Sequence, residues 1–161
     1  MQIENVVYNM QELIVRKAAD FLKVNLGVFP AVVVIGPRQC GKSTLVRMVA
    51  DGLTDFVYLD LQNRNDLAKL NEHELFFQAN RNKTICLDEI QLMPDLFSVL
   101  RSEIDSNRQN GRFILLGSAS RDLIQKSSES LAGRIWIIEL TPFLISELHQ
   151  RKQFDLIQYW F

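Results

Sequence analysis

The chain contains, at residues 31–44, the stretch Ala31-Val32-Val33-Val34-Ile35-Gly36-Pro37-Arg38-Gln39-Cys40-Gly41-Lys42-Ser43-Thr44. Its first part, 31–35, is uncharged and rich in β-branched residues, which is typical of a strand buried on both faces. Its second part, 36–44, has the spacing G-x-x-x-x-G-K-[ST] of a phosphate-binding loop. The residues that follow, up to Ala50, alternate apolar and polar at helical spacing. The stretch therefore predicts a strand, a glycine-rich turn and a helix, the local structure that binding phosphate requires.

The residue types of the loop suit this chemistry. Gly36 and Gly41 let the backbone turn so that successive N–H groups point inward, at the positive end of the following helix. We expect Lys42 to reach the β- and γ-phosphates of a nucleotide and Ser43 to complete the coordination of Mg²⁺. A chance glycine-rich turn is the alternative, and the strand in front of the loop argues against it. The expected nucleotide-binding residues are Gly36, Pro37, Arg38, Gln39, Cys40, Gly41, Lys42, Ser43 and Thr44.

An acidic pair follows the later apolar run 85–87. We expect Asp88 to hold Mg²⁺ through its water shell and Glu89 to polarise the water that attacks the γ-phosphate. The metal ligand must stay ionised beside Mg²⁺, while the base must face the nucleophile. A solvated Asp-Glu turn is the alternative, and the loop upstream favours the catalytic interpretation.

Other polar residues near strand ends are weaker candidates. Ser118 could contact the γ-phosphate or the attacking water, although a helix cap by Ser118 or Ser120 fits equally well. Arg134 could stabilise transition-state charge, either in its own chain or by reaching a neighbouring subunit. Spacing alone favours a solvated or salt-bridged surface arginine at this position. Arg38 faces either the phosphates or solvent, and Cys40 most simply fills a variable position of the loop.

Hydrophobic patterning along the chain alternates between strands and helices, and this pattern predicts a parallel α/β sheet that binds ligands at the carboxyl ends of its strands. The fold class expected is therefore α/β, a three-layer P-loop NTPase core with a mainly parallel five-stranded sheet and helices on both faces. The expected strands are 31–35, 56–60, 84–87, 113–116 and 135–140, and the expected helical regions are 10–26, 44–50, 62–80, 94–107 and 120–126.

Length and composition limit the class of protein. The chain has 161 residues, enough for one domain with a core, and it is 47% hydrophobic and 23% charged with a net charge of −1. Basic residues are not in excess, so the composition does not point to nucleic acid as a partner. We find neither a secretory leader nor an apolar stretch long enough to span a bilayer. Cys40 and Cys86 are too few for a disulfide scaffold, so a cytoplasmic protein is expected.

The last residues, 154–161, read Phe-Asp-Leu-Ile-Gln-Tyr-Trp-Phe and are apolar on nearly every side of a short helix. One short helix hides one face well but not two. We therefore expect a nucleotide-binding domain over 1–149 and, over 150–161, the start of a truncated C-terminal helical segment. The alternative is that this segment packs back on the sheet.

The motifs together resemble the AAA-type prokaryotic P-loop ATPases over about residues 8–149. The loop and the acidic motif are shared by many P-loop ATPases, whereas the stretch from 131 to 143 is more particular to this family. The resemblance is carried by residues 36–45, Leu87-Asp88-Glu89-Ile90-Gln91, Leu116-Gly117-Ser118-Ala119-Ser120, Leu131-Ala132-Gly133-Arg134, Leu140-Thr141-Pro142-Phe143 and Ser146-Glu147-Leu148.

This resemblance implies a core in which the strand before Ser118 lies between the loop strand and the Asp88 strand. It implies Mg-ATP as ligand, Ser118 as a phosphate sensor and Arg134 as a candidate arginine finger. The hydrolytic set that it implies is Lys42, Ser43 or Thr44, Asp88 and Glu89. Members usually continue into a winged-helix segment and a nuclease-like domain, which this chain lacks, so a C-terminal domain, a protein partner or a homo-oligomer would complete it.

Three functions follow as competing hypotheses. The first is a Mg-dependent ATPase, and the second is an ATP-binding module or switch without turnover in this fragment. A small-molecule kinase is less favoured, because such enzymes have little use for a water-polarising Glu89. GTP is also less favoured, because residues 82–85 lack the aspartate of the guanine-reading motif Asn-Lys-x-Asp.

Overall fold

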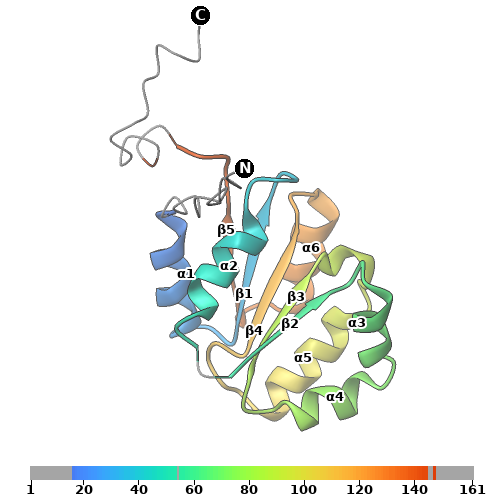
Figure 1. Cartoon of the computed structure of the whole chain (residues 1–161). Helices are drawn as coiled ribbons and strands as arrows, with labels where there is room; N and C mark the ends of the chain where they lie inside the picture. Colours follow the sequence, from blue (N-terminus) through green and yellow to red (C-terminus); the bar gives the residue numbers. More distant parts are fainter. Residues whose placement is uncertain (1–15, 54, 145–146, 148–161) are drawn as a thin grey trace, which may run out of the picture.

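A five-stranded parallel sheet forms the centre of the molecule (Figure 1). The computed structural model describes residues 16–53, 55–144 and 147. The spatial order of the strands is β2-β3-β4-β1-β5, so β4 lies between the loop strand and the Asp88 strand, as the resemblance implied. The strands are β1 (Ala31–Gly36), β2 (Phe56–Asp60), β3 (Thr84–Asp88), β4 (Phe113–Ser118) and β5 (Ile135–Glu139).

The register of the strands brings the start of the phosphate-binding loop, Ser118 and Asp88 to the same side of the sheet, at the carboxyl ends of the strands. Gly36 at the end of β1 is opposite Ser118 at the end of β4. On the other side of β4, Asp60 at the end of β2 is opposite Asp88 at the end of β3. Because all neighbouring strands are parallel, their carboxyl ends meet at this edge.

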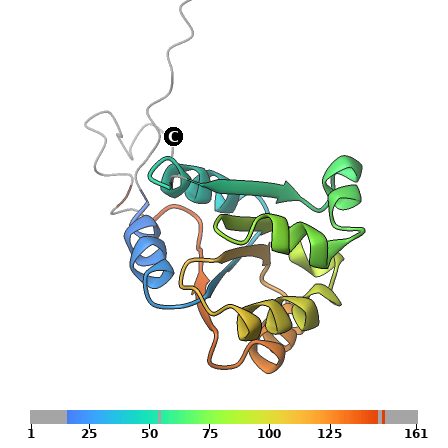
Figure 2. The same ribbon diagram turned by 90° about the horizontal axis from the view of Figure 1, so that it is seen from below.

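Helices cover both faces of the sheet, which confirms the expected three-layer α/β architecture (Figures 1 and 2). Helices α1 (Ala18–Leu26) and α2 (Lys42–Ala50) pack on one face. Helices α3 (Arg64–Lys69), α4 (His73–Ala79), α5 (Leu96–Ser106) and α6 (Arg121–Ser130) pack on the other. A short 3₁₀ turn, η1 (Ile90–Leu92), follows β3.

The core explains why β1 is apolar at successive positions. Val32 and Val34 pack with α1 and α2, while Val33 and Ile35 pack with the helices of the opposite face. All four side chains are buried, because β1 is an inner strand with helices on both sides. The strand in front of the loop is therefore fixed from both faces, and so is the point at which the loop begins.

Element boundaries differ from the expected ones in several places. Helix α1 begins at Ala18, and the expected helical residues 10–15 lie outside the described residues, as do 150–161. The region 62–80 divides into α3 and α4. Helix α6 is longer than expected and ends at Ser130. None of the helices in the described ranges is long and apolar enough to cross a membrane.

Candidate functional site

The loop at 36–41 leads from β1 directly into α2, at the carboxyl edge of the sheet. Gly41 precedes the helix with a φ of 92°, a left-handed conformation that favours glycine, and Gln39 also has a positive φ of 62°. The Nζ of Lys42 donates hydrogen bonds to the carbonyl oxygens of Gly36 and Pro37, at 3.0 and 2.9 Å. The loop thus curves around the buried lysine at the first position of α2.

Close packing beneath the loop explains the glycine at its start. A Cβ on Gly36 would lie 2.3 Å from the carbonyl oxygen of Leu140 and 2.9 Å from the sulfur of Cys40. The buried Cys40 therefore packs under the loop, a contact that its position in the motif did not reveal. The backbone after β5 passes so close that no larger residue fits at position 36 without movement.

Arg16, which precedes α1, joins this loop to the segment that follows β5. Its Nη1 donates to the carbonyl oxygen of Cys40 at 2.9 Å, and its Nη2 donates to that of Thr141 at 2.6 Å. Its Nε forms an ion pair with the carboxylate of Glu147 at 3.2 Å, and both side chains are buried. Nothing in the local sequence identified Arg16, because its three partners come together only in the folded chain.

Asp88 is the first residue of the acidic pair, and its side chain is buried at the end of β3. The hydroxyl of Ser43 donates to its Oδ2 at 2.7 Å, and the hydroxyl of Tyr58 donates to the same oxygen. The backbone N–H of Glu89 donates to Oδ1 at 2.9 Å. The structure thus brings the loop and the acidic pair together, and it adds Tyr58 from β2.

Tyr58 remains a hydrogen-bond donor because its hydroxyl resists ionisation. Burial raises its pKa well above the ordinary value, and the hydrogen bond to Asp88 raises it further. The guanidinium of Arg47 on α2 lies 5.6 Å from the centre of the Tyr58 ring. The sequence signal that could have indicated Tyr58 is its position on a strand next to β3, which requires the strand order to be known.

Glu89 has an unusual backbone and a second contact. Its φ is 58°, a left-handed conformation that is uncommon for a residue with a side chain. Its carboxylate accepts a hydrogen bond from the Nε2 of Gln91, which lies on η1. The chain thus turns sharply directly after β3, at the residue proposed as the base.

A cavity of about 480 Å³ opens where these groups meet. Gln62, two residues after β2, also lines it, and sequence analysis did not select that residue. The lining residues are Arg38, Gln39, Gly41, Lys42, Ser43, Thr44, Gln62, Asp88 and Glu89. Most of the expected nucleotide-binding residues thus surround one space, together with both acidic residues.

Ser118 and Ser120 have different surroundings at the end of β4. The side chain of Ser120 accepts a hydrogen bond from the backbone N–H of Leu123 at 3.3 Å and so caps α6. Ser118 is half-buried and lies in register with Gly36 at the loop edge of the sheet. The capping role therefore belongs to Ser120, and Ser118 is placed beside the phosphate-binding loop.

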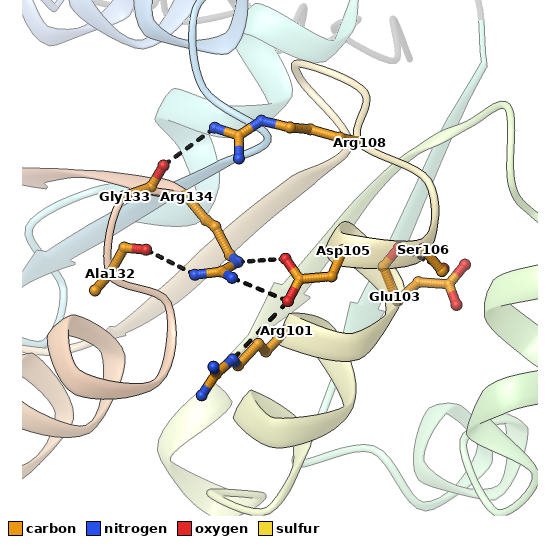
Figure 3. A network of polar contacts seen from close by, with 8 residues as sticks. All are labelled: Arg101, Glu103, Asp105, Ser106, Arg108, Ala132, Gly133 and Arg134. Atoms are coloured by element: carbon orange, nitrogen blue, oxygen red, sulfur yellow. Dashed lines mark hydrogen bonds and ion pairs between the residues drawn. The ribbon is translucent and has the colours of Figure 1, made fainter.

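Arg134 lies directly before β5, at the amino ends of the strands and thus opposite to the carboxyl ends where the loop lies. Its guanidinium forms a two-point ion pair with Asp105 on α5, at 2.6 and 2.9 Å (Figure 3). Its Nη1 also donates to the carbonyl oxygen of Ala132 at 2.8 Å. A strand of this length spans about 17 Å, so Arg134 does not meet the loop of its own chain. The geometry does not support a role in the same chain, and a role toward a neighbouring subunit remains a prediction.

A strand–loop–helix with glycine in left-handed conformation, beside an acidic strand end and with strand order β2-β3-β4-β1-β5, defines a P-loop ATPase core of the AAA type. The family model described as "AAA domain" matches residues 28–149. The chain belongs to this AAA domain family.

The names of two relatives in sequence give no activity. An uncharacterised protein of Mycobacterium tuberculosis is 39% identical to the chain over 133 residues, and an uncharacterised protein of Mycobacterium bovis matches equally well. The match covers 83% of this chain and 30% of each relative. The chain thus spans less than a third of the length of these relatives.

Solved structures support the fold. A Walker-type ATPase of Pyrococcus abyssi aligns with a TM-score of 0.58 at 16% identity, covering 86% of this chain and 57% of that one. A structure from a study of katanin self-assembly aligns with a TM-score of 0.56 at 19% identity, covering 83% and 53%. A DNA replication initiation factor aligns with a TM-score of 0.52 at 14% identity, covering 86% and 51%. At these identities the likeness concerns the fold alone.

Proposed function

We propose that the chain binds Mg-ATP in the 480 Å³ cavity and that Glu89 polarises the water that hydrolyses it. The observation that carries this proposal is the hydrogen bond of 2.7 Å between Ser43 and Asp88. It joins the phosphate-binding loop to the acidic strand end. The residues that we propose to bind phosphate, to hold the metal and to polarise water therefore line the same cavity. P-loop ATPases need these three functions close together.

Phosphate binding would rest on the loop and on Lys42. Its ammonium now contacts two neutral carbonyl oxygens, at 3.0 and 2.9 Å. Charge-assisted hydrogen bonds to phosphate oxygens are stronger than such contacts. ATP would therefore draw the Lys42 side chain from its own loop toward the β- and γ-phosphates, while backbone N–H groups at the start of α2 bind the same anion.

The residues present suit Mg²⁺. The hydroxyl of Ser43 would be a ligand of the ion, Asp88 would hold the ion through its water shell, and phosphate oxygens would supply further ligands. Glu89 N–H and Tyr58 both donate to Asp88 and so fix its orientation. Held by these residues, Mg²⁺ would supply positive charge that offsets the negative charge developing on the phosphate.

Three further roles complete the proposal. Glu89 would accept a proton from the attacking water, because its side chain lines the cavity. Ser118 would contact the γ-phosphate from the end of β4. Arg134 would act on a nucleotide held by a neighbouring subunit, once its pair with Asp105 opens. This last role requires a homo-oligomer, and the name of the katanin structure concerns self-assembly of that protein.

An ATP-binding switch without turnover is the second candidate. The observation that favours it is the engagement of Arg134 with Asp105, which leaves the single chain without this arginine at the nucleotide. In such a switch, bound ATP would organise the contacts of this domain with a partner protein or with a C-terminal domain. A small-molecule kinase is less favoured, because Glu89 would have no water to polarise. The composition has no excess of basic residues, so it does not point to nucleic acid as a partner. We also propose that the protein acts in the cytoplasm.

Glu89→Gln tests the proposal, with Glu129→Gln on the exposed side of α6 as the matched control. We expect Glu89→Gln to bind ATP as the wild type does, by calorimetry, and to release phosphate at least about a hundredfold more slowly. Tight binding without phosphate release by the wild type would support the switch instead. Absence of ATP binding would exclude both, and a phosphate acceptor that accelerates ATP consumption would favour the kinase.

A further inference from the structure

Gln91 contacts the candidate base and is not among the residues that line the cavity. It belongs to η1, two residues after Glu89, and its Nε2 donates a hydrogen bond to the Oε2 of Glu89. Glu89 itself lines the cavity. Gln91 thus holds one carboxylate oxygen of a residue that lines the cavity without being one of the lining residues itself.

The other end of the Gln91 amide faces β4. Its Oε1 is buried and has no hydrogen-bond partner among the residues that the structure describes. A Cβ on Gly117, the residue before Ser118, would lie 2.8 Å from this oxygen. Gly117 thus leaves the space that lets the amide lie against the end of β4, next to the expected phosphate sensor.

This arrangement is costly for a residue that only fills space. A buried amide oxygen without a partner destabilises the folded state, and an apolar side chain of similar size would avoid that cost. What Gln91 offers that an apolar side chain does not is the N–H donated to Glu89. The contact with the base is therefore the feature that explains an amide here.

The backbone leaves the Glu89 side chain in need of such a contact. The main chain at Glu89 is held in a left-handed conformation, and its N–H is bound by Asp88. The remaining freedom is that of the side-chain torsions, and a long glutamate has several rotamers. One hydrogen bond from Gln91 restricts these rotamers and selects one direction for the carboxylate.

We propose that Gln91 is a positioning residue that orients the Glu89 carboxylate at the wall of the cavity and links it to the end of β4. This inference rests on the proposed hydrolysis of ATP. It predicts that loss of the amide slows the chemical step through Glu89 and leaves nucleotide binding unchanged, because Gln91 does not line the cavity.

The test compares Gln91→Met, which keeps the length of the side chain without its donor, with Gln125→Met on α6. Gln125 is a matched control, since its Nε2 also donates to a glutamate, Glu129, at 2.8 Å on an exposed surface. We expect Gln91→Met to lower kcat at least about tenfold with an unchanged KM for ATP. Its melting temperature should equal or exceed that of the wild type, because the variant removes the unpartnered oxygen.

A double variant separates positioning from other effects. If Gln91 acts through Glu89, adding Gln91→Met to Glu89→Gln should not slow hydrolysis further. Equal rates of Gln91→Met and wild type, beside a slow Glu89→Gln, would overturn the Gln91 assignment alone. A lower melting temperature together with additive rate losses would also overturn it, in favour of a structural role. A wild type as slow as Glu89→Gln would overturn the proposed hydrolysis, and this inference with it.

Discussion

The hydroxyl of Ser43 lies 2.7 Å from Oδ2 of Asp88, although 45 residues separate them in the chain. Ser43 is fixed by the first turn of α2, and Asp88 by the end of β3. Two elements that are distant in sequence thus bring a hydroxyl and a carboxylate into contact, and we propose that these two groups hold Mg²⁺.

Asp88→Asn should remove the Mg²⁺ dependence of ATP binding. An amide lacks the negative charge that attracts the ion, and it is a poorer acceptor for its donors Ser43, Tyr58 and Glu89 N–H. Calorimetric titration with ATP in Mg²⁺ and in EDTA measures the difference. The exposed Asp20→Asn on α1 serves as control and should keep the Mg²⁺ dependence. A Mg²⁺ effect of wild-type size in Asp88→Asn would contradict the metal assignment.

Tyr58→Phe should destabilise the fold by about 1–2 kcal/mol, because it removes a hydrogen bond to a buried carboxylate. The pKa of Tyr58 is raised by burial and then by Asp88, so the folded protein keeps the proton longer than the unfolded chain does. The resulting stability is present below about pH 10, the ordinary tyrosine pKa, and is lost as the pH rises above it.

Urea unfolding at pH 7–11 measures this contribution. The difference in unfolding free energy between wild type and Tyr58→Phe should shrink above about pH 10. A difference that stays constant over the whole range would mean that the hydroxyl does not titrate differently in the two states.

Gly36→Ala should abolish ATP binding and lower stability by about 1–3 kcal/mol, as overpacking typically does. The added Cβ would lie 2.3 Å from the Leu140 carbonyl oxygen, a backbone atom that cannot turn aside. Gly52→Ala is the control, because its Cβ would lie 3.6 Å from the nearest backbone oxygen. Thermal unfolding and ATP titration of both variants measure the effects. Unchanged ATP affinity in Gly36→Ala would show that the loop tolerates displacement from the chain after β5.

Arg134→Ala should slow hydrolysis without weakening ATP binding, if Arg134 acts on a neighbouring subunit. A mixture of Arg134→Ala and Glu89→Gln chains should then regain part of the activity that each lacks alone, because a mixed assembly contains a site with Glu89 and a neighbour with Arg134. Phosphate release at increasing total protein concentration measures this recovery.

Mixing without recovery would contradict an action across subunits. Asp105→Asn provides a second comparison, because it weakens the ion pair that now occupies the Arg134 guanidinium. If release of Arg134 limits turnover, this variant should hydrolyse ATP faster than the wild type at equal concentration.

Much of the fold could be predicted from local patterns. Apolar runs such as 31–35 and 113–116 are long, β-branched or leucine-rich, and bounded by glycine, so all five strands lie within a residue or two of the expected ranges. The helix bounds deviate more than the strand bounds: the expected helix 120–126 continues to Ser130, and the region 62–80 divides into α3 and α4. The expected place of β4 between β1 and β3 came from the family resemblance, since local periodicity carries no strand order.

The candidate site divides in the same way. The spacing of the phosphate-binding loop is local, so Lys42, Ser43 and the acidic pair could be selected from the sequence. Tyr58 and Gln62 could not, because they reach the site from β2 and the turn after it, whose place beside β3 is decided by strand order. Arg16 could not either, because its partners at 40, 141 and 147 are far from it in the chain. Gln91 stood in the quoted motif, yet its contact with Glu89 depends on the turn that the chain makes after β3.

The sequence by itself determined the elements and the chemistry that one loop and one strand end can offer, because those depend on residues that are neighbours in the chain. Only the tertiary structure decided which strand ends meet. It placed Ser43 against Asp88 and put Arg134 at the far edge of the sheet with Asp105. The physical reason is that parallel strands with helical crossovers align all carboxyl ends at one edge and all amino ends at the other.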